Sequence, residues 1–361
     1  MPTVLLTSVL SLPAAAATGA SADGPTEAEQ RFAEHTAQLA EQADGEQAQV
    51  VVGSDGYLFF APELRHLGLG RFWGERAIEV SRARNPDWAD PLPAIVDFHE
   101  QAQRAGVELI FVPIPAKATI YPDKLPDAPS SDEPARLDPA HRAFLDALRG
   151  HGVTVIDLTA DFLAHRAATD DAEAQRLYCK QDTHFSPRGA ELAADRLATL
   201  IAAHGWLDDD EPGRAYRTRE LELTIDGDLR QMLGDPDLPR ETLRANQVID
   251  HATNAPPEPD RDSPVLLLAD SHGLAFHAGG DMHASGAGLV DHLAARLGLP
   301  LDLIAVRGSG ATPSRLQLLR RRDELAGKRV VIWCLSVREY TQGDGWRRVP
   351  VVPERPDDAP R

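Results

Sequence analysis

Residues 264–273 read PVLLLADSHG and join a short apolar run to a serine and a glycine. A continuous apolar run of this length indicates a buried strand, and Gly273 predicts a turn directly after it. Reactive side chains of open α/β sheets gather where the strands end. Ser271 would then lie near free N–H groups at a helix start, which can hold an oxyanion. The plainer alternative for Ser271 is a helix cap.

The same pattern recurs on both sides of this stretch. Further strand-like runs are VELIFVPIP (107–115), VTVIDL (153–158), LDLIAV (301–306) and KRVVIWCLS (328–336). Helix-like stretches separate them at 95–106, 139–149, 187–205, 292–298 and from about residue 313. Strands that alternate with helices predict an α/β fold with a mainly parallel sheet. Closer to the N-terminus, residues 26–43 have helical composition, and two short runs around Ser54-Asp55-Gly56 predict a hairpin.

Three segments interrupt this rhythm. Residues 1–25 hold an apolar run followed by small residues, as a secretory signal peptide or leader does. Residues 206–262 are rich in Asp, Pro and Arg, and we expect an irregular insertion with one strand within RELELTI. Residues 346–361 are predicted to form a disordered tail. A single catalytic domain is therefore expected over residues 26–345.

Composition narrows the class of protein. Of the 361 residues, 42 % are hydrophobic and 26 % are charged, which is ordinary globular usage and excludes a wholly disordered chain. The net charge of −19 argues against general binding to nucleic acid. Two cysteines, Cys179 and Cys334, are too few for a disulfide scaffold, so two packing thiols are expected rather than one bridge.

A second polar segment, CKQDTHFSP at residues 179–187, precedes a capped helix. Asp182 and His184 stand two residues apart in this expected loop and can face one cleft. The acid would orient the imidazole, and the imidazole would take the proton of a serine such as Ser271. An isolated pair of this kind is more often a surface loop or a capping pair.

Several motifs resemble the alginate O-acetyltransferase family of the AlgJ/AlgX type, exported SGNH-hydrolase-like proteins that acetylate bacterial polysaccharides. KQDTHFSPRGA is similar to the family's D-T-H-[WF]-[ST]-P-x-G-A block, and LLLADSHG stands at the place of its serine-bearing strand end. The resemblance continues in order through VVGSDGYLFF, FVPIPAKATIYPDKLP, DGDL (226–229), RGSGA (307–311) and IWCLSVREY (332–340). It covers about residues 50–340, with Ala269 where the family usually has glycine.

The resemblance implies a three-layer αβα sandwich, circularly permuted, in which Asp182, His184 and Ser271 form a catalytic triad. It also implies O-acetyl transfer onto an alginate-like exported polysaccharide through an acyl-serine, with no cofactor and no metal. The acetyl donor would come from a membrane-bound O-acyltransferase, and the chain would be periplasmic or otherwise extracytoplasmic, with its leader cleaved or kept as an anchor. Further oxyanion or substrate-binding candidates are Arg307, Gly308, Ser309, Lys117, Tyr121, Arg338 and Tyr340. The plainer alternative is a surface cation for Arg307, and support of the core for Lys117, Tyr121, Arg338 and Tyr340.

Three alternatives stay open. The same triad would serve an SGNH esterase or polysaccharide deacetylase, and the same fold could be a non-catalytic polysaccharide-binding assembly component. The third alternative is a metal site, because Asp182/His184 and Asp270/His272 repeat one Asp-x-His spacing. The plainer expectation for His277, His283 and His292 is surface polarity, and the triad gives His272 no role.

Overall fold

A five-stranded parallel sheet forms the centre of the computed structural model, which describes residues 24–128, 135–169, 175–207 and 213–353. The strand order is β4-β3-β9-β7-β8, and every neighbouring pair is parallel. The strands are β3 (Glu108–Ile114), β4 (Thr154–Val155), β7 (Val265–Ala269), β8 (Asp302–Ala305) and β9 (Val330–Ser336). Every residue of β3, β7 and β9 except Glu108 is buried, which explains their continuous apolar sequences.

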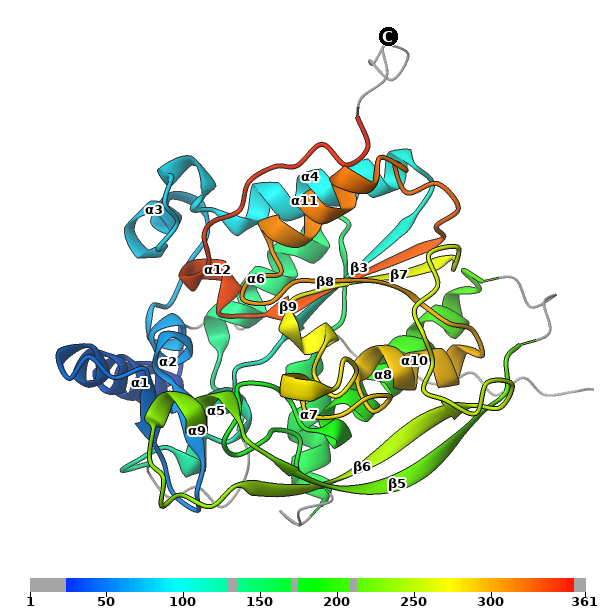
Figure 1. The fold of residues 1–361 in the computed structure, drawn as a ribbon. Helices are drawn as coiled ribbons and strands as arrows, with labels where there is room; N and C mark the ends of the chain where they lie inside the picture. The colour runs from blue at the N-terminus through cyan, green and yellow to red at the C-terminus, as the bar shows by residue number, and fades with distance from the viewer. Residues whose placement is uncertain (1–23, 129–134, 170–174, 208–212, 354–361) are drawn as a thin grey trace, which may run out of the picture.

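Helices cover both faces of this sheet (Figure 1). One face carries α4 (Pro91–Arg104), α6 (Pro139–Gly150) and α11 (Thr312–Arg321). The other carries α7 (Leu158–Ala168), α8 (Pro187–His204) and α10 (Leu289–Leu297). The predicted α/β class, with three layers and a mainly parallel sheet, is confirmed.

Local signals set the ends of the helices next to the site. Ser186 caps α8 by accepting a hydrogen bond from the Gly189 N–H at 3.2 Å, and Pro187 occupies the first turn. Gly205 ends the helix in the left-handed conformation at φ 61°. The start of α8 fixes where the preceding loop, which carries Asp182 and His184, enters the domain.

The N-terminal region packs against the side of the sandwich. Helix α1 (Glu27–Gly45) begins at a capping box and packs on α2 (Ala61–Gly68). Strands β1 (Val50–Val52) and β2 (Leu58–Phe60) form the antiparallel hairpin expected around residues 54–56. The remaining short α-helices are α3 (Ala77–Val80), α5 (Lys117–Ile120), α9 (Asp228–Leu233) and α12 (Glu339–Gln342).

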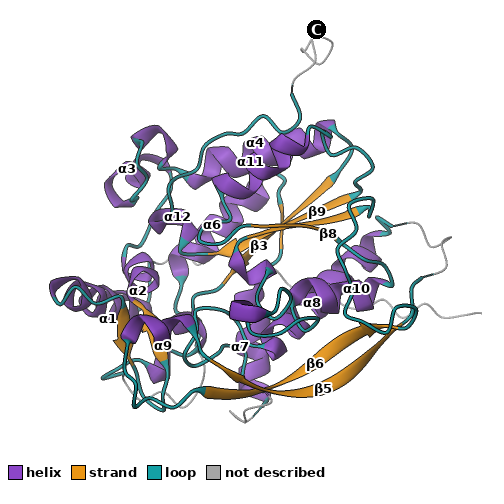
Figure 2. Cartoon of the chain, viewed as in Figure 1, coloured by secondary structure: helices purple, strands orange, loops and turns teal. Residues whose placement is uncertain are grey.

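The segment expected to be an irregular insertion is more regular than its composition indicated. Strands β5 (Tyr216–Ile225) and β6 (Glu241–Asp250) pair antiparallel over their whole length and form a two-stranded sheet that is separate from the central sheet (Figure 2). The expectation of one strand was wrong because the buried face of β6 is only partly apolar. Its inward-facing positions include the buried polar residues Glu241 and Gln247.

The segment predicted to be a disordered tail is partly packed. Residues 346–353 lie against α4, where the Gln101 side chain donates to the Val349 carbonyl and accepts from the Val352 N–H, each at 2.9 Å. Trp346 is buried and its ring lies 5.7 Å from that of Trp333. The tail prediction was therefore wrong for residues 346–353, because a few apolar side chains suffice to anchor a segment rich in proline and charge.

Two expectations lie largely outside the described residues. The leader at residues 1–25 falls almost wholly there, as does the tail from residue 354. Within the described part of the chain, no helix combines the length and the apolar character needed to cross a membrane. Cys179 and Cys334 are free and buried, as packing thiols would be.

Candidate active site

Three side chains from two distant segments form a hydrogen-bonded relay at the ends of the strands. Ser271 opens a short 3-10 helix (Ser271–Gly273) directly after β7. Its Oγ lies 2.8 Å from Nε2 of His184, and Nδ1 of the same ring lies 2.6 Å from Oδ1 of Asp182. The structure thus brings together the serine, the histidine and the acid that the sequence singled out.

The loop that carries Asp182 and His184 is held by its own backbone and by a glycine. The Cys179 N–H donates to the His184 carbonyl, and Tyr178 bridges to Phe185, so the loop closes on itself. A Cβ on Gly227 would lie 2.1 Å from the Gln181 carbonyl oxygen, so only glycine permits this approach. Gly227 is the glycine of the DGDL motif, and its close contact with this loop explains why a glycine stands at this position of the motif.

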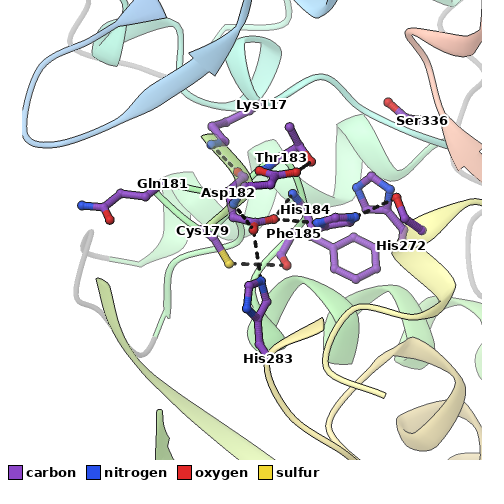
Figure 3. A network of polar contacts seen from close by, with 12 residues as sticks. Lys117, Cys179, Gln181, Asp182, Thr183, His184, Phe185, His272, His283 and Ser336 are labelled. Atoms are coloured by element: carbon purple, nitrogen blue, oxygen red, sulfur yellow. Dashed lines mark hydrogen bonds and ion pairs between the residues drawn. The ribbon is translucent and has the colours of Figure 1, made fainter. Parts of the chain in front are cut away.

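The Asp182 carboxylate accepts four hydrogen bonds (Figure 3). Oδ1 accepts from the backbone N–H and Nδ1 of His184, and Oδ2 accepts from the Asp228 N–H at 2.9 Å and from Nε2 of His283 at 3.0 Å. Burial by itself would raise the pKa of Asp182, but the charge and hydrogen bonds of His184 and His283 outweigh it. The pKa of Asp182 is held well below its usual range, and the acid stays ionised.

The same pairing acts on the histidine in the opposite direction. Burial favours the neutral ring of His184, yet the charge and hydrogen bond of Asp182 prevail and raise the pKa of His184 above its ordinary value. An imidazole that gains a proton readily, next to a serine hydroxyl, has the properties of a general base.

His272 has a structural role beside the relay. Its Nδ1 lies 3.0 Å from Oδ1 of Asp270, whose other oxygen accepts the Ser336 N–H at 2.8 Å. Burial outweighs the Asp270 charge and lowers the pKa of His272, which keeps this ring neutral. Asp270 and His272 thus tie the turn that carries Ser271 to the end of β9, while the ring of His272 packs 4.8 Å from that of His184.

The paired Asp-x-His motifs do not converge on one ion site. Among the described residues, the ligand atoms that lie within 4.8 Å of one another belong to Asp182, His184 and Asp228. The Asp182 oxygens are taken by four N–H groups, and Asp228 accepts from the Thr183 N–H and hydroxyl at 2.7 and 2.5 Å. These donors occupy all four acceptor positions of Asp182 and two of about four on Asp228, while Asp270 and His272 are not part of this cluster.

A pocket of about 690 Å³ opens over the relay. Its wall includes His184 and Ser271 together with four predicted oxyanion or substrate-binding residues: Arg307, Gly308, Ser309 and Arg338. Met232 and Met282 add apolar surface to the wall. A volume of this size accommodates a small acyl donor or part of a sugar chain.

The turn opposite Ser271 is fixed by close packing. A Cβ on Gly310 would lie 2.7 Å from the Asp270 nitrogen, so this turn lies directly against the residue before Ser271. The Ser309 hydroxyl donates to Glu339, and Arg307 forms an exposed ion pair with Asp281. Burial raises the pKa of Glu339 to about 7, against the opposing effects of Ser309 and Arg338.

Three predicted cleft residues lie in the core instead, and their assignment to substrate binding was wrong. Lys117 is 1 % exposed, and its Nζ donates to the carbonyl oxygens of Leu58, Lys180 and Asp182. The Tyr121 hydroxyl accepts from the Leu177 N–H, and Tyr340 stacks on Phe72 with ring centroids 4.9 Å apart. Each follows a strand end, but neighbouring elements cover it.

The expectation of surface histidines was also wrong. His277 pairs with Asp291 at 2.9 Å, His292 is buried near Glu191, and the His283 side chain is only 5 % exposed. Sequence reasoning also missed Asp228 and Glu339 at the site. Asp228 belongs to the DGDL motif and Glu339 to the IWCLSVREY segment, but neither residue was itself given a role.

An αβα sandwich with a serine at the end of β7 and an Asp-x-His loop beside it defines an SGNH-hydrolase-like protein. Residues 50–337 match the family described as "SGNH hydrolase-like domain, acetyltransferase AlgX". The chain therefore belongs to this family, as its motifs predicted.

Individual relatives agree with this assignment. The chain is 30 % identical over 210 residues to a probable alginate O-acetylase AlgJ of Pseudomonas aeruginosa, covering 58 % of this chain and 47 % of that protein. It thus spans about half the length of this relative. The O-acetyltransferase domain of Pseudomonas putida AlgJ has a similar fold, with a TM-score of 0.60 at 21 % identity over 81 % of this chain and 92 % of that one. Pseudomonas aeruginosa AlgX follows with a TM-score of 0.55 at 17 % identity, over 85 % and 68 % of the two chains.

Proposed function

We propose that this chain is an O-acetyltransferase that transfers an acetyl group through Ser271 onto hydroxyl groups of an exported, alginate-like polysaccharide. The observation that carries the proposal is the relay from Ser271 Oγ through His184 to an ionised Asp182 at the wall of an open pocket. Membership of the acetyltransferase family and the likeness to alginate O-acetylases support the acetyl group and the polysaccharide acceptor.

In the first step, Ser271 Oγ attacks the acetyl carbonyl carbon while Nε2 of His184 takes the hydroxyl proton. Asp182 stabilises the imidazolium that forms, and the protonated ring then gives its proton to the departing group. The negative oxygen of the tetrahedral intermediate would be bound by the Ser271 N–H and by an N–H of Gly308 or Ser309, which line the same pocket.

In the second step, a sugar hydroxyl gives its proton to His184 and its oxygen attacks the acetyl carbonyl carbon. The bond from that carbon to Ser271 Oγ breaks, and His184 returns the proton to Oγ, which restores the free serine. Water in place of the sugar would make the same site an esterase. We place the reaction outside the cytoplasm, where the segment at residues 1–25 would direct the chain as a signal or an anchor. A membrane-bound O-acyltransferase would supply the acetyl donor. No step calls for a cofactor or for nucleic acid.

The test is to incubate the protein with an activated acetyl ester and to measure its intact mass and ester turnover. We expect an acetyl adduct on the wild-type chain that is absent from Ser271→Ala and strongly reduced in His184→Ala. Ser263→Ala is the matched control, because Ser263 is a buried serine just before the same strand, where it caps Val265. An adduct that persists in Ser271→Ala would refute the proposed nucleophile.

Acceptor specificity is a separate measurement. Adding oligosaccharides to the acylated protein should shift the acetyl group from water to sugar if the chain is a transferase. Mannuronate oligomers and neutral oligosaccharides of equal length would be compared by mass spectrometry. Release of acetate at one rate, whatever sugar is present, would favour an esterase.

A further inference from the structure

His283 reaches the candidate triad from a separate loop, 101 residues away from Asp182 in the sequence. Its Nε2 lies 3.0 Å from Oδ2 of Asp182, whereas His184 contacts the other carboxylate oxygen, Oδ1 (Figure 3). The His283 ring packs against the ring of Phe276, with ring centroids 5.2 Å apart. The Asp182 carboxylate therefore accepts a hydrogen bond from an imidazole on each of its two oxygens.

The backbone at His283 is strained in a way that local sequence does not explain. The Ala284 N–H donates to the Met282 carbonyl at 3.1 Å, and His283 between them has φ 78° and ψ −66°. These angles define the rare γ-turn with positive φ, which costs free energy for a side chain with a Cβ. Such strain persists only where surrounding contacts impose it. Here the Phe276 N–H donates to the Met282 carbonyl and the Gly279 N–H to the Ala284 carbonyl, each at 2.8 Å, and the turn held in this way presents the imidazole to Asp182.

We propose that His283 is a positioning residue for acyl transfer: it fixes the Asp182 carboxylate so that Oδ1 faces Nδ1 of His184. This rests on the proposed function of the Ser271 relay. His283 and the Asp228 N–H together satisfy Oδ2, while His184 satisfies Oδ1. Without the His283 donor, the carboxylate loses one of four restraints and can turn away from the His184 ring.

His283 acts on Asp182, and Ser271 hydrogen-bonds only with His184 in the described relay, so the expected effect falls on the chemical step. A hydrogen bond to a charged group corresponds to roughly a 10- to 100-fold change in an equilibrium or rate. We expect His283→Phe, which keeps an aromatic ring but has no donor, to lower kcat for ester turnover by about that factor, with KM within about twofold. His283→Gln, whose amide nitrogen can occupy the place of Nε2, should retain most of the rate.

The second readout needs no substrate. The proton between His184 Nδ1 and Asp182 gives a low-field NMR resonance, which we expect to shift or broaden in His283→Phe and to stay in His283→Gln. His283→Asn covers a folding failure of the phenylalanine variant, because asparagine tolerates positive φ and its amide is too short to reach Asp182. His283→Asn should then show the same fall in kcat and the same change in the resonance as those expected of His283→Phe.

An unchanged rate and an unchanged resonance in His283→Phe would overturn the proposal. So would equal losses in His283→Phe and His283→Gln, because these would indicate that only ring packing matters. If the wild-type chain shows no turnover at all, the proposed acyl transfer fails. The resonance would then still decide whether His283 positions Asp182.

Discussion

Replacing Asp182 with asparagine tests the relay most directly, because the side chain keeps its shape and loses its charge. The carboxylate accepts four N–H groups, two on each oxygen. An asparagine amide has one oxygen and one NH₂ group, so two of the four donors face another donor in either orientation. The change therefore removes two charge-assisted hydrogen bonds without creating a cavity.

The magnitude follows from which donors are lost. If the NH₂ group faces His184, Nδ1 must become the acceptor, and Nε2 then carries the proton and cannot take one from Ser271. In a serine triad the wrong histidine tautomer costs about 10⁴ in kcat. If the amide oxygen faces His184 instead, the imidazolium loses its negative partner, which also slows proton transfer. Stability should fall by about 3–5 kcal/mol, because buried donors are left without an acceptor.

The stability difference should depend on pH. The pKa of Asp182 is depressed in the folded chain, so its contribution is present above the pKa of an unfolded aspartate and is lost as pH falls through the folded-state pKa. The gap between wild type and Asp182→Asn should accordingly shrink in acid. Urea unfolding near neutral pH and in acid measures this gap, and turnover of an activated acetyl ester measures the rate.

Asp228→Asn is the matched control. Asp228 lies in the same cluster, but its carboxylate accepts from Thr183 and not from His184. Its ester turnover should fall by no more than about 10- to 100-fold, well short of the loss expected for Asp182→Asn. The reasoning would be refuted if Asp182→Asn kept a comparable rate, or if Asp228→Asn lost as much activity as Asp182→Asn.

Three further changes probe the surroundings of the relay. Lys117→Met should lower stability in urea by roughly 2–4 kcal/mol, because three buried carbonyl oxygens lose their donor, while the folded variant still acylates; an unchanged stability would contradict this role. Gly310→Ala should cost about 1–3 kcal/mol and slow acylation, since its Cβ would lie 2.7 Å from the Asp270 nitrogen; normal acylation would show that the turn can shift. Glu339 holds its proton to about pH 7 when folded, so its contribution to stability is lost as pH rises from about 4.5 to about 7, by on the order of 3 kcal/mol. Urea unfolding of Glu339→Gln across this range should lack that decline, and an identical pH slope would refute the assignment.

The sequence was informative wherever a signal is local or periodic. The buried strands are continuous apolar runs, so β3, β7 and β9 could be predicted within a residue or two. Ser186, Pro187 and Gly205 set the ends of α8 through interactions within a single turn. The Asp-x-His block and the serine at a strand end likewise predicted which chemistry to look for.

Other features depend on which elements come to cover one another. The hairpin partner β6 was missed because its buried positions include Glu241, which binds Lys180 and Gln181 N–H groups from another loop. Residues 346–353 were assigned to a disordered tail, although Gln101 on α4 satisfies their backbone. These partners are distant in the sequence, so no window along the chain contains both.

The α/β architecture could be predicted from the sequence alone, because its strands and helices differ in the period of their apolar residues. The resemblance of its motifs to a known family singled out Asp182, His184 and Ser271 as the candidate triad. Which polar side chains near the strand ends reach the pocket could be seen only in the folded chain. Lys117 was expected in the cleft and is buried beneath it, whereas His283 was expected on the surface and contacts Asp182. Both outcomes follow from the same physical cause: burial and hydrogen-bond partners are set by segments that meet only when the chain is folded.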